Sequence, residues 1–169
     1  HVFQIEGERR MSRAQVWDGA LRLAGYFRER GLVPGDVVSI QLPNWMETAV
    51  IALAARMAGL VINPVPPIYR ESELAYILSD CRSRLIFVPG VFRKHDHTAM
   101  LSALRGKLPN LDEIVTVRGC GAVTFDALIA RPPMAEVDLA QTDPDAAVIA
   151  MYTSGTTGRP KGVLHTHNT

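Results

Sequence analysis

The residues best suited to chemistry lie near the end of the chain, in the segment Tyr152-Thr153-Ser154-Gly155-Thr156-Thr157-Gly158-Arg159-Pro160-Lys161-Gly162. This segment combines Ser and Thr hydroxyls with three glycines and one lysine. Glycines let the backbone turn sharply and bring its N–H groups close to an anion, because no Cβ stands in the way. The hydroxyls add neutral hydrogen-bond donors, and the lysine adds a positive charge. The segment therefore predicts a loop that binds a polyphosphate.

The loop differs from a Walker phosphate loop. A Walker loop ends in Gly-Lys-Ser/Thr and leads directly into a helix. Here Pro160 precedes Lys161 and Gly162 follows it, and the next residues, Val163 and Leu164, indicate a second strand. The apolar run 146–151 predicts a buried strand before the loop. We therefore expect residues 153–162 to form a mobile loop that joins two strands of a sheet.

The run Tyr152 to Val163 resembles the phosphate loop of the adenylate-forming superfamily, which comprises acyl-CoA synthetases, adenylation domains of peptide synthetases and luciferases. The resemblance extends, with less specific motifs, to residues 31–38, 42–44 with Glu47, 54–67 and 74–78. The segment Asn63 to Arg70 and the end of the chain, 164–169, look most like an acyl-CoA synthetase. This resemblance implies the first part of the large N-terminal domain of such an enzyme.

Members of the superfamily join a carboxylic acid to AMP at the expense of ATP and release pyrophosphate; the synthetases then transfer the acyl group to coenzyme A. The resemblance implies that the β- and γ-phosphates of ATP contact Thr153, Ser154, Gly155, Thr156, Thr157, Gly158 and Lys161. Arg159 falls at a variable position and is expected to face solvent. No residue matches a catalytic acid, base or nucleophile or a metal ligand, so the Mg²⁺ ligand is expected outside these residues. The acid that is activated cannot be read from the sequence.

The elements that must position this loop alternate along the chain. Strands are predicted at 37–42, 60–62, 84–88 and 113–117, and helices at 12–30, 45–58, 71–78, 98–104 and 125–130. Ser12 and Gln15 form a capping box at the start of the first helix. Residues 63–67, with three prolines, are predicted to be neither helix interior nor central strand. The alternation indicates an α/β fold with a mostly parallel sheet covered by helices on both faces.

The composition indicates the class of protein and the compartment in which it is expected. Of 169 residues, 47% are hydrophobic and the formal net charge is +1, which is typical of a globular protein without a basic surface for nucleic acid. The longest apolar stretch, 48–62, contains Arg56 and is too short for a transmembrane segment. Cys81 and Cys120 fit no metal spacing and are too few for a disulfide framework, so a cytoplasmic setting is expected. The oligomeric state stays open.

Several other residues could be taken for functional groups. His95 and His97 have a spacing that could bind a metal, but their charged neighbours favour a solvated loop. Glu47 and Glu73 could form a carboxylate pair, but they lie on separate predicted helices and are expected at the surface. His167 could orient the loop or cap a following helix, although a purely structural role is favoured. Trp17 and Trp45 are expected in the core.

Three functions are compatible with these observations. The first is the N-terminal part of an ATP-dependent carboxylate–CoA ligase of fatty acid metabolism. The second is an amino-acid adenylation domain that feeds a carrier protein. The third is an inactive, truncated remnant that acts as a nucleotide-binding or interaction module. We expect residues 1–169 to be a partial N-terminal AMP-binding (adenylation) domain, cut at both ends, that is inactive and poorly soluble or oligomeric alone.

Overall fold

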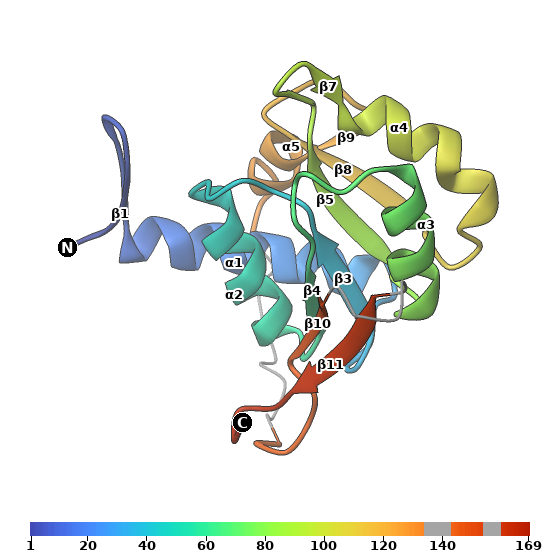
Figure 1. Cartoon of the computed structure of the whole chain (residues 1–169). Helices are drawn as coiled ribbons and strands as arrows, with labels where there is room; N and C mark the ends of the chain where they lie inside the picture. Colours follow the sequence, from blue (N-terminus) through green and yellow to red (C-terminus); the bar gives the residue numbers. More distant parts are fainter. Residues whose placement is uncertain (134–142, 154–159) are drawn as a thin grey trace.

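A seven-stranded sheet organises the chain in a computed structural model, which describes residues 1–133, 143–153 and 160–169 (Figure 1). The strand order is β11-β10-β4-β3-β5-β8-β9. Strands β10 to β9 in this order are parallel, and β11 is antiparallel to β10. The seven strands are β3 (Val37–Ile40), β4 (Val61–Pro64), β5 (Leu85–Pro89), β8 (Glu113–Val117), β9 (Val123–Thr124), β10 (Ile149–Thr153) and β11 (Lys161–His165). The predicted mostly parallel sheet is confirmed.

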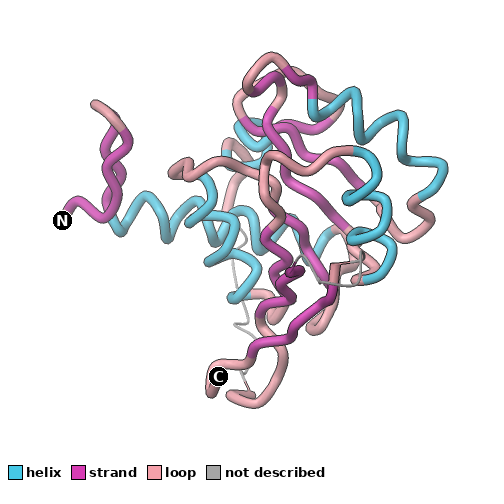
Figure 2. The backbone as a smooth tube through the Cα atoms, in the orientation of Figure 1, coloured by secondary structure: helices cyan, strands magenta, loops and turns pink. Residues whose placement is uncertain are grey.

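Helices cover both faces of the sheet, as predicted (Figures 1 and 2). Helices α1 (Arg13–Glu29), α2 (Glu47–Met57) and α5 (Phe125–Ile129) bury their apolar sides with Val38, Ile40 and Phe87 in one core cluster. Helices α3 (Glu71–Asp80) and α4 (His97–Leu104), the latter followed by a 3-10 turn at Arg105–Lys107, pack against Ile86 and Val88 in a second cluster. Because neighbouring residues of β5 point to opposite faces, this strand contributes to both clusters.

The first helix begins where the sequence predicts it. The Gln15 N–H donates to Ser12 Oγ at 3.2 Å, and the Ser12 N–H donates to Gln15 Oε1 at 2.8 Å. This capping box satisfies backbone groups that the first turn of a helix leaves without partners. Before the helix, β1 (Val2–Glu6) and β2 (Arg9–Ser12) form an antiparallel hairpin that stands away from the sheet (Figure 2).

Residues 63–67 depart from the prediction. Asn63 and Pro64 belong to β4, which lies between β10 and β3 in the sheet. Pro64 is tolerated because it is the last residue of the strand and lies beyond the ladder pair of β4 with β10; on the other side, the Val65 N–H still donates to the Ile40 carbonyl of β3 at 2.9 Å. The buried Asn63 donates through Nδ2 to Ser39 Oγ at 2.8 Å, so its polar side chain is bonded inside the sheet layer.

Smaller differences concern boundaries and short elements. The strand before the loop is Ile149–Thr153 and not 146–151, because residues 144–146 form a turn and bend. The sequence did not predict the two-residue strands β6 (Val91–Phe92), β7 (His95–Asp96) and β9, which are too short to carry a periodic pattern.

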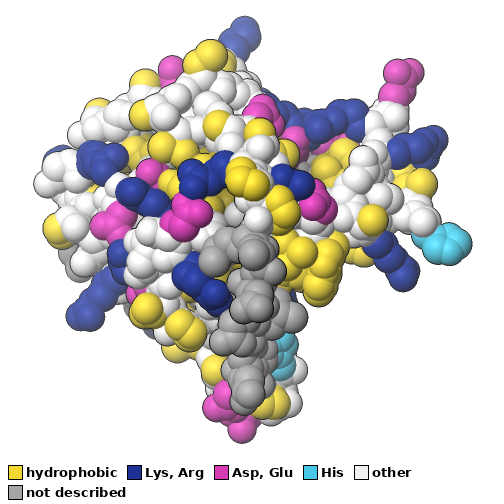
Figure 3. Space-filling view, turned by 180° about the vertical axis from the view of Figure 1, so that it is seen from behind, with side chains coloured by type: hydrophobic (Ala, Val, Ile, Leu, Met, Phe, Trp, Pro, Cys, Tyr) yellow, Lys and Arg dark blue, Asp and Glu magenta, His cyan; other side chains and the backbone are white. Residues whose placement is uncertain are grey.

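None of the helices in the described parts of the chain is long and apolar enough to cross a membrane. On the face seen in Figure 3, Lys and Arg side chains are interspersed with Asp and Glu side chains. This face thus carries charges of both signs.

Candidate functional site

The ends of the predicted phosphate loop are held in one antiparallel hairpin. Strand β10 pairs with β11 (Lys161–His165), and the register places Thr153 opposite Lys161. Both side chains are exposed. The loop therefore connects two strands, and the predicted difference from a Walker loop, which leads into a helix, is confirmed.

The middle of the loop lies outside the described residues. Ser154, Gly155, Thr156, Thr157 and Gly158, together with Arg159, fall within 154–159, so their predicted phosphate contacts and the expected mobility stay predictions. Thr153 and Lys161 are the members of the predicted site that the structure places. They lie side by side at the loop end of the hairpin, where a hydroxyl donor and a cation can approach one anion together.

Tyr152, the residue before the loop, is anchored to helix α3. Its hydroxyl donates to Asp80 Oδ2 at 2.5 Å, and its ring packs against the second core cluster. Burial, and then the hydrogen bond to Asp80, raise the pKa of Tyr152 well above its ordinary value of 10.0, so the phenol stays neutral. The sequence motif predicts no such contact, because Asp80 lies 72 positions earlier in the chain.

The expectation of a solvated loop at His95 and His97 is wrong. His97 is the first residue of α4 and is fully buried, with Nδ1 3.3 Å from Gln41 Oε1. Burial lowers the pKa of His97 to about 4, so this imidazole is neutral near pH 7. His97, Met100, Leu101 and Leu104 share the buried side of the helix, and this helical spacing could have identified the histidine as a core residue.

His95 is half-buried, and its ring meets that of His97 edge to face with centroids 4.9 Å apart. Within the residues that the structure describes, no group of three His, Cys, Asp or Glu side chains could hold a metal ion. The observed role of the two histidines is this ring contact.

The expected surface position is wrong for Glu47. Glu47 and Glu73 lie on separate helices, as expected, but Glu47 is only 4% exposed. Arg118 binds Glu47 through Nε and Nη2 at 2.9 and 2.7 Å, and Arg9 approaches the same carboxylate at 3.3 Å. Glu73 is half-buried and accepts from the Arg70 N–H at 3.3 Å, near the start of α3.

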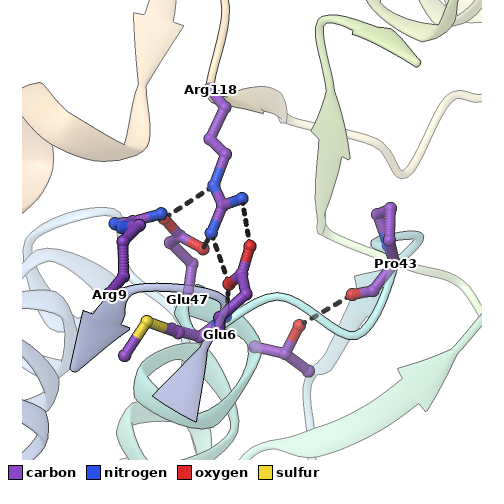
Figure 4. A network of polar contacts seen from close by, with 7 residues as sticks. Glu6, Arg9, Pro43, Glu47 and Arg118 are labelled. Atoms are coloured by element: carbon purple, nitrogen blue, oxygen red, sulfur yellow. Dashed lines mark hydrogen bonds and ion pairs between the residues drawn. The ribbon is translucent and has the colours of Figure 1, made fainter. Parts of the chain in front are cut away.

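Arg118 joins Glu47 to the N-terminal hairpin (Figure 4). Its Nη1 and Nη2 donate to the two oxygens of Glu6 at 2.6 and 2.7 Å, and Glu6 Oε2 also accepts from the Met46 N–H at 3.0 Å. The hydrogen bonds from Arg118 lower the pKa of Glu6 from 4.5 to about 2. We call Glu6, Arg9, Glu47 and Arg118 the hairpin latch.

The remaining candidates occupy structural positions. Trp17 is 48% exposed, contrary to the expected core position, because it lies about 100° around α1 from the buried Val16. Trp45 is half-buried, with the guanidinium carbon of Arg118 4.3 Å from its ring centroid. His167 is exposed; its N–H donates to the Pro144 carbonyl, and its Nδ1 lies 3.5 Å from Arg56 Nη1.

Known proteins resemble the chain over its whole length. A family model described as AMP-binding enzyme matches residues 1–169. The medium-chain fatty-acid–CoA ligase of Escherichia coli (strain K12) is 34% identical over 86% of this chain and 26% of its own length. Tyrocidine synthase 2 of Brevibacillus parabrevis is 31% identical over 99% of this chain and 4% of its own length.

Solved structures share the fold. The anthranilate CoA ligase AuaEII, in complex with anthranoyl-AMP, has a TM-score of 0.88 and 25% identity, and the match covers 99% of this chain and 32% of that one. The chain thus spans about a quarter to a third of the CoA ligases that it resembles.

Proposed function

The chain belongs to the AMP-binding enzyme family, and we propose that it is the N-terminal part of an ATP-dependent carboxylate–CoA ligase. In this proposal, residues 1–169 form the first part of the AMP-binding (adenylation) domain. The observation that carries the proposal is the pairing of Thr153 with Lys161 at the two ends of the Ser/Thr/Gly-rich loop. The similarity to named CoA ligases supports coenzyme A as the acceptor of the acyl group.

The proposed reaction has two steps. A carboxylate oxygen of the acid attacks the α-phosphorus of ATP, a P–O bond forms, and the bond to pyrophosphate breaks. The thiol of coenzyme A then attacks the acyl carbon and displaces AMP, while the thiol proton is released. Negative charge grows on the departing pyrophosphate in the first step, and fixed donors around it stabilise that charge.

The hairpin supplies the donors in this proposal. Lys161 provides positive charge, and Thr153, Ser154, Thr156 and Thr157 provide hydroxyls, while Gly155 and Gly158 let the backbone approach the β- and γ-phosphates. Mg²⁺ bound to ATP neutralises part of the phosphate charge. We propose no Mg²⁺ ligand within the described residues. Cys81 and Cys120 are free, which supports the cytoplasm as the proposed setting.

One alternative has support of its own. The similarity to Tyrocidine synthase 2 favours an amino-acid adenylation domain as the second candidate. The adenylation step and the proposed roles of the loop residues are the same in both candidates. The acceptor distinguishes them: coenzyme A in the first, and the thiol of a carrier protein in the second.

The test uses the complete product of the gene that encodes this chain. Acid-dependent exchange of labelled pyrophosphate into ATP is measured with straight-chain fatty acids, aromatic acids and amino acids in parallel. CoA-dependent formation of a thioester then separates the two candidates. ATP binding without exchange for any acid would instead support an inactive nucleotide-binding module.

Lys161→Ala provides the residue-level test. A charge-assisted contact contributes about 1.5–3 kcal/mol, so we expect exchange to fall roughly 10- to 100-fold. Lys107→Ala is the matched control, since Lys107 is exposed in the 3-10 turn after α4. Equal exchange rates in the two variants would remove Lys161 from the site.

A further inference from the structure

The hairpin that carries the phosphate loop has few backbone bonds to the rest of the sheet. Within the described residues, the ladder between β10 and β4 consists of the pair Ile149 and Ile62. From Ala150 to Thr153, β10 pairs with β11. The orientation of the loop end of the hairpin therefore depends on side-chain contacts.

Packing does not fill the space beside this part of the hairpin. A pocket of about 390 Å³ lies between the hairpin and the start of β3 and β4. Its lining includes Val37, Val61 and Ala150, together with Asp80 and Tyr152. The hydrogen bond from Tyr152 to Asp80 thus links the hairpin to the body at the wall of an open space.

Asp80 is a firm attachment point. It is the last residue of α3, a helix whose Leu74, Ile77 and Leu78 are each at most 1% exposed in the second core cluster. The Tyr152 ring packs against the same cluster, and its hydroxyl reaches Asp80 Oδ2 at 2.5 Å. Tyr152 therefore fixes the rotation of β10 relative to a helix whose apolar side is buried.

Gly162 provides the space for this tyrosine. The register pairs Gly162 with Tyr152, and a Cβ added at Gly162 would lie 3.2 Å from Cζ and 3.3 Å from the hydroxyl oxygen of the tyrosine. Such distances are shorter than ordinary contacts, so the ring would have to move. The glycine after Lys161 is thus needed here for space beside the ring.

Successive side chains of a strand point to opposite faces. Because Tyr152 points toward α3, the next residue, Thr153, points to the other face, and its partner Lys161 is fixed with it by the ladder. We propose that Asp80 and Tyr152 are positioning residues of the phosphate loop, which orient Thr153 and Lys161 toward the phosphates of ATP. This inference rests on the proposed function, and it adds two residues that lie outside the Ser/Thr/Gly-rich loop.

The experiment is a double-mutant cycle in the complete gene product. Tyr152→Phe and Asp80→Ala each remove the bond, and Asp80→Asn keeps an oxygen that can accept it. We expect each of the first two variants to lower kcat/KM for ATP about tenfold, the double variant to fall no further, and the KM for the acid to stay unchanged. Asp80→Asn should keep most of the wild-type value.

Tyr26→Phe is the matched control, because Tyr26 also donates to a carboxylate, that of Glu113, in the other core cluster. Amide hydrogen exchange gives a readout that needs no ATP: exchange in 150–153 and 161–165 should accelerate in Tyr152→Phe and stay unchanged in Tyr26→Phe.

The outcomes separate the two proposals. If the wild-type protein shows no acid-dependent exchange of pyrophosphate, the proposed function and this inference both fail. If the wild type is active and Tyr152→Phe keeps its kcat/KM for ATP, only the positioning role is overturned. Equal kinetic losses in Tyr152→Phe and Tyr26→Phe would also overturn it, because they would indicate a general loss of stability.

Discussion

The β1–β2 hairpin and the β10–β11 hairpin are attached to the rest of the molecule in different ways. The β1–β2 hairpin is held by the hairpin latch, in which Arg118 binds the carboxylates of Glu6 and Glu47 with two hydrogen bonds each. The β10–β11 hairpin is held by one ladder pair to β4 and by the bond from Tyr152 to Asp80. The first attachment is ionic and partly buried. The second combines packing of the Tyr152 ring against the second core cluster with one hydrogen bond from a neutral donor to an exposed carboxylate.

The two kinds of attachment should differ in what they contribute, the first to stability and the second to the orientation of the phosphate loop. An ion pair that includes a buried carboxylate is costly to break, since the charge left behind has lost its hydration. A single hydrogen bond to an exposed group contributes little to stability, but it can still fix the direction of a strand. We therefore expect changes at the first hairpin to affect unfolding most, and changes at the second to affect ATP use most.

Arg118→Ala tests the first half of this comparison and has the largest expected effect on stability. It leaves Glu47, 4% exposed, with only the more distant Arg9, so the free energy of unfolding should fall by about 3 kcal/mol. Urea unfolding followed by circular dichroism measures the change. Asp18→Asn, which breaks the exposed ion pair with Arg22 on α1, should cost less than about 0.5 kcal/mol. Similar losses in the two variants would contradict a stabilising latch.

Acid should weaken the first hairpin through Glu6. The pKa of Glu6 is about 2 in the folded protein and 4.5 ordinarily, so the unfolded chain takes up this proton first as the pH falls. The stabilisation is complete above pH 4.5 and is lost toward pH 2. In Glu6→Gln, the fall in unfolding free energy over this range should be smaller by on the order of 1 kcal/mol. Glu8→Gln, on the same hairpin, should follow the wild type; a Glu6→Gln curve that matches it would exclude this linkage.

Tyr152→Phe should have the smallest effect on stability, about 0.5 kcal/mol near neutral pH, because water can replace the donor to the exposed Asp80. At alkaline pH, the unfolding free energy should change with pH in the direction opposite to that caused by Glu6. The pKa of Tyr152 is raised above 10.0 in the folded protein, so its stabilisation is lost as the pH rises above that value. Urea unfolding at neutral and alkaline pH checks both statements. A loss of unfolding free energy as large as that of Arg118→Ala would contradict the proposed difference between the two hairpins.

Local sequence patterns predicted most elements of the sheet and its helices. The capping box of Ser12 and Gln15 and the strands predicted at 84–88 and 113–117 depend on neighbours in sequence. The structure confirms them, with β5 at Leu85–Pro89 and β8 at Glu113–Val117. The loop motif likewise predicted two flanking strands. These features need no knowledge of distant residues.

Contacts between distant residues explain the errors. Glu47 seemed a surface residue because its burial depends on Arg118, 71 positions later. Asn63 could enter the central strand β4 because Ser39 and Cys81 accept its amide N–H groups. Asp80 likewise gains its role through Tyr152, and no pattern near either residue shows the pair.

The arginine beside Trp45 has an optical consequence. The chain has two tryptophans: Trp17 is 48% exposed, whereas Arg118 lies over the half-buried ring of Trp45. A nearby cation changes the excited state of an indole, so the emission of Trp45 should depend on the position of this arginine. In a Trp17→Phe background, fluorescence would therefore report when the N-terminal hairpin detaches, without any added label.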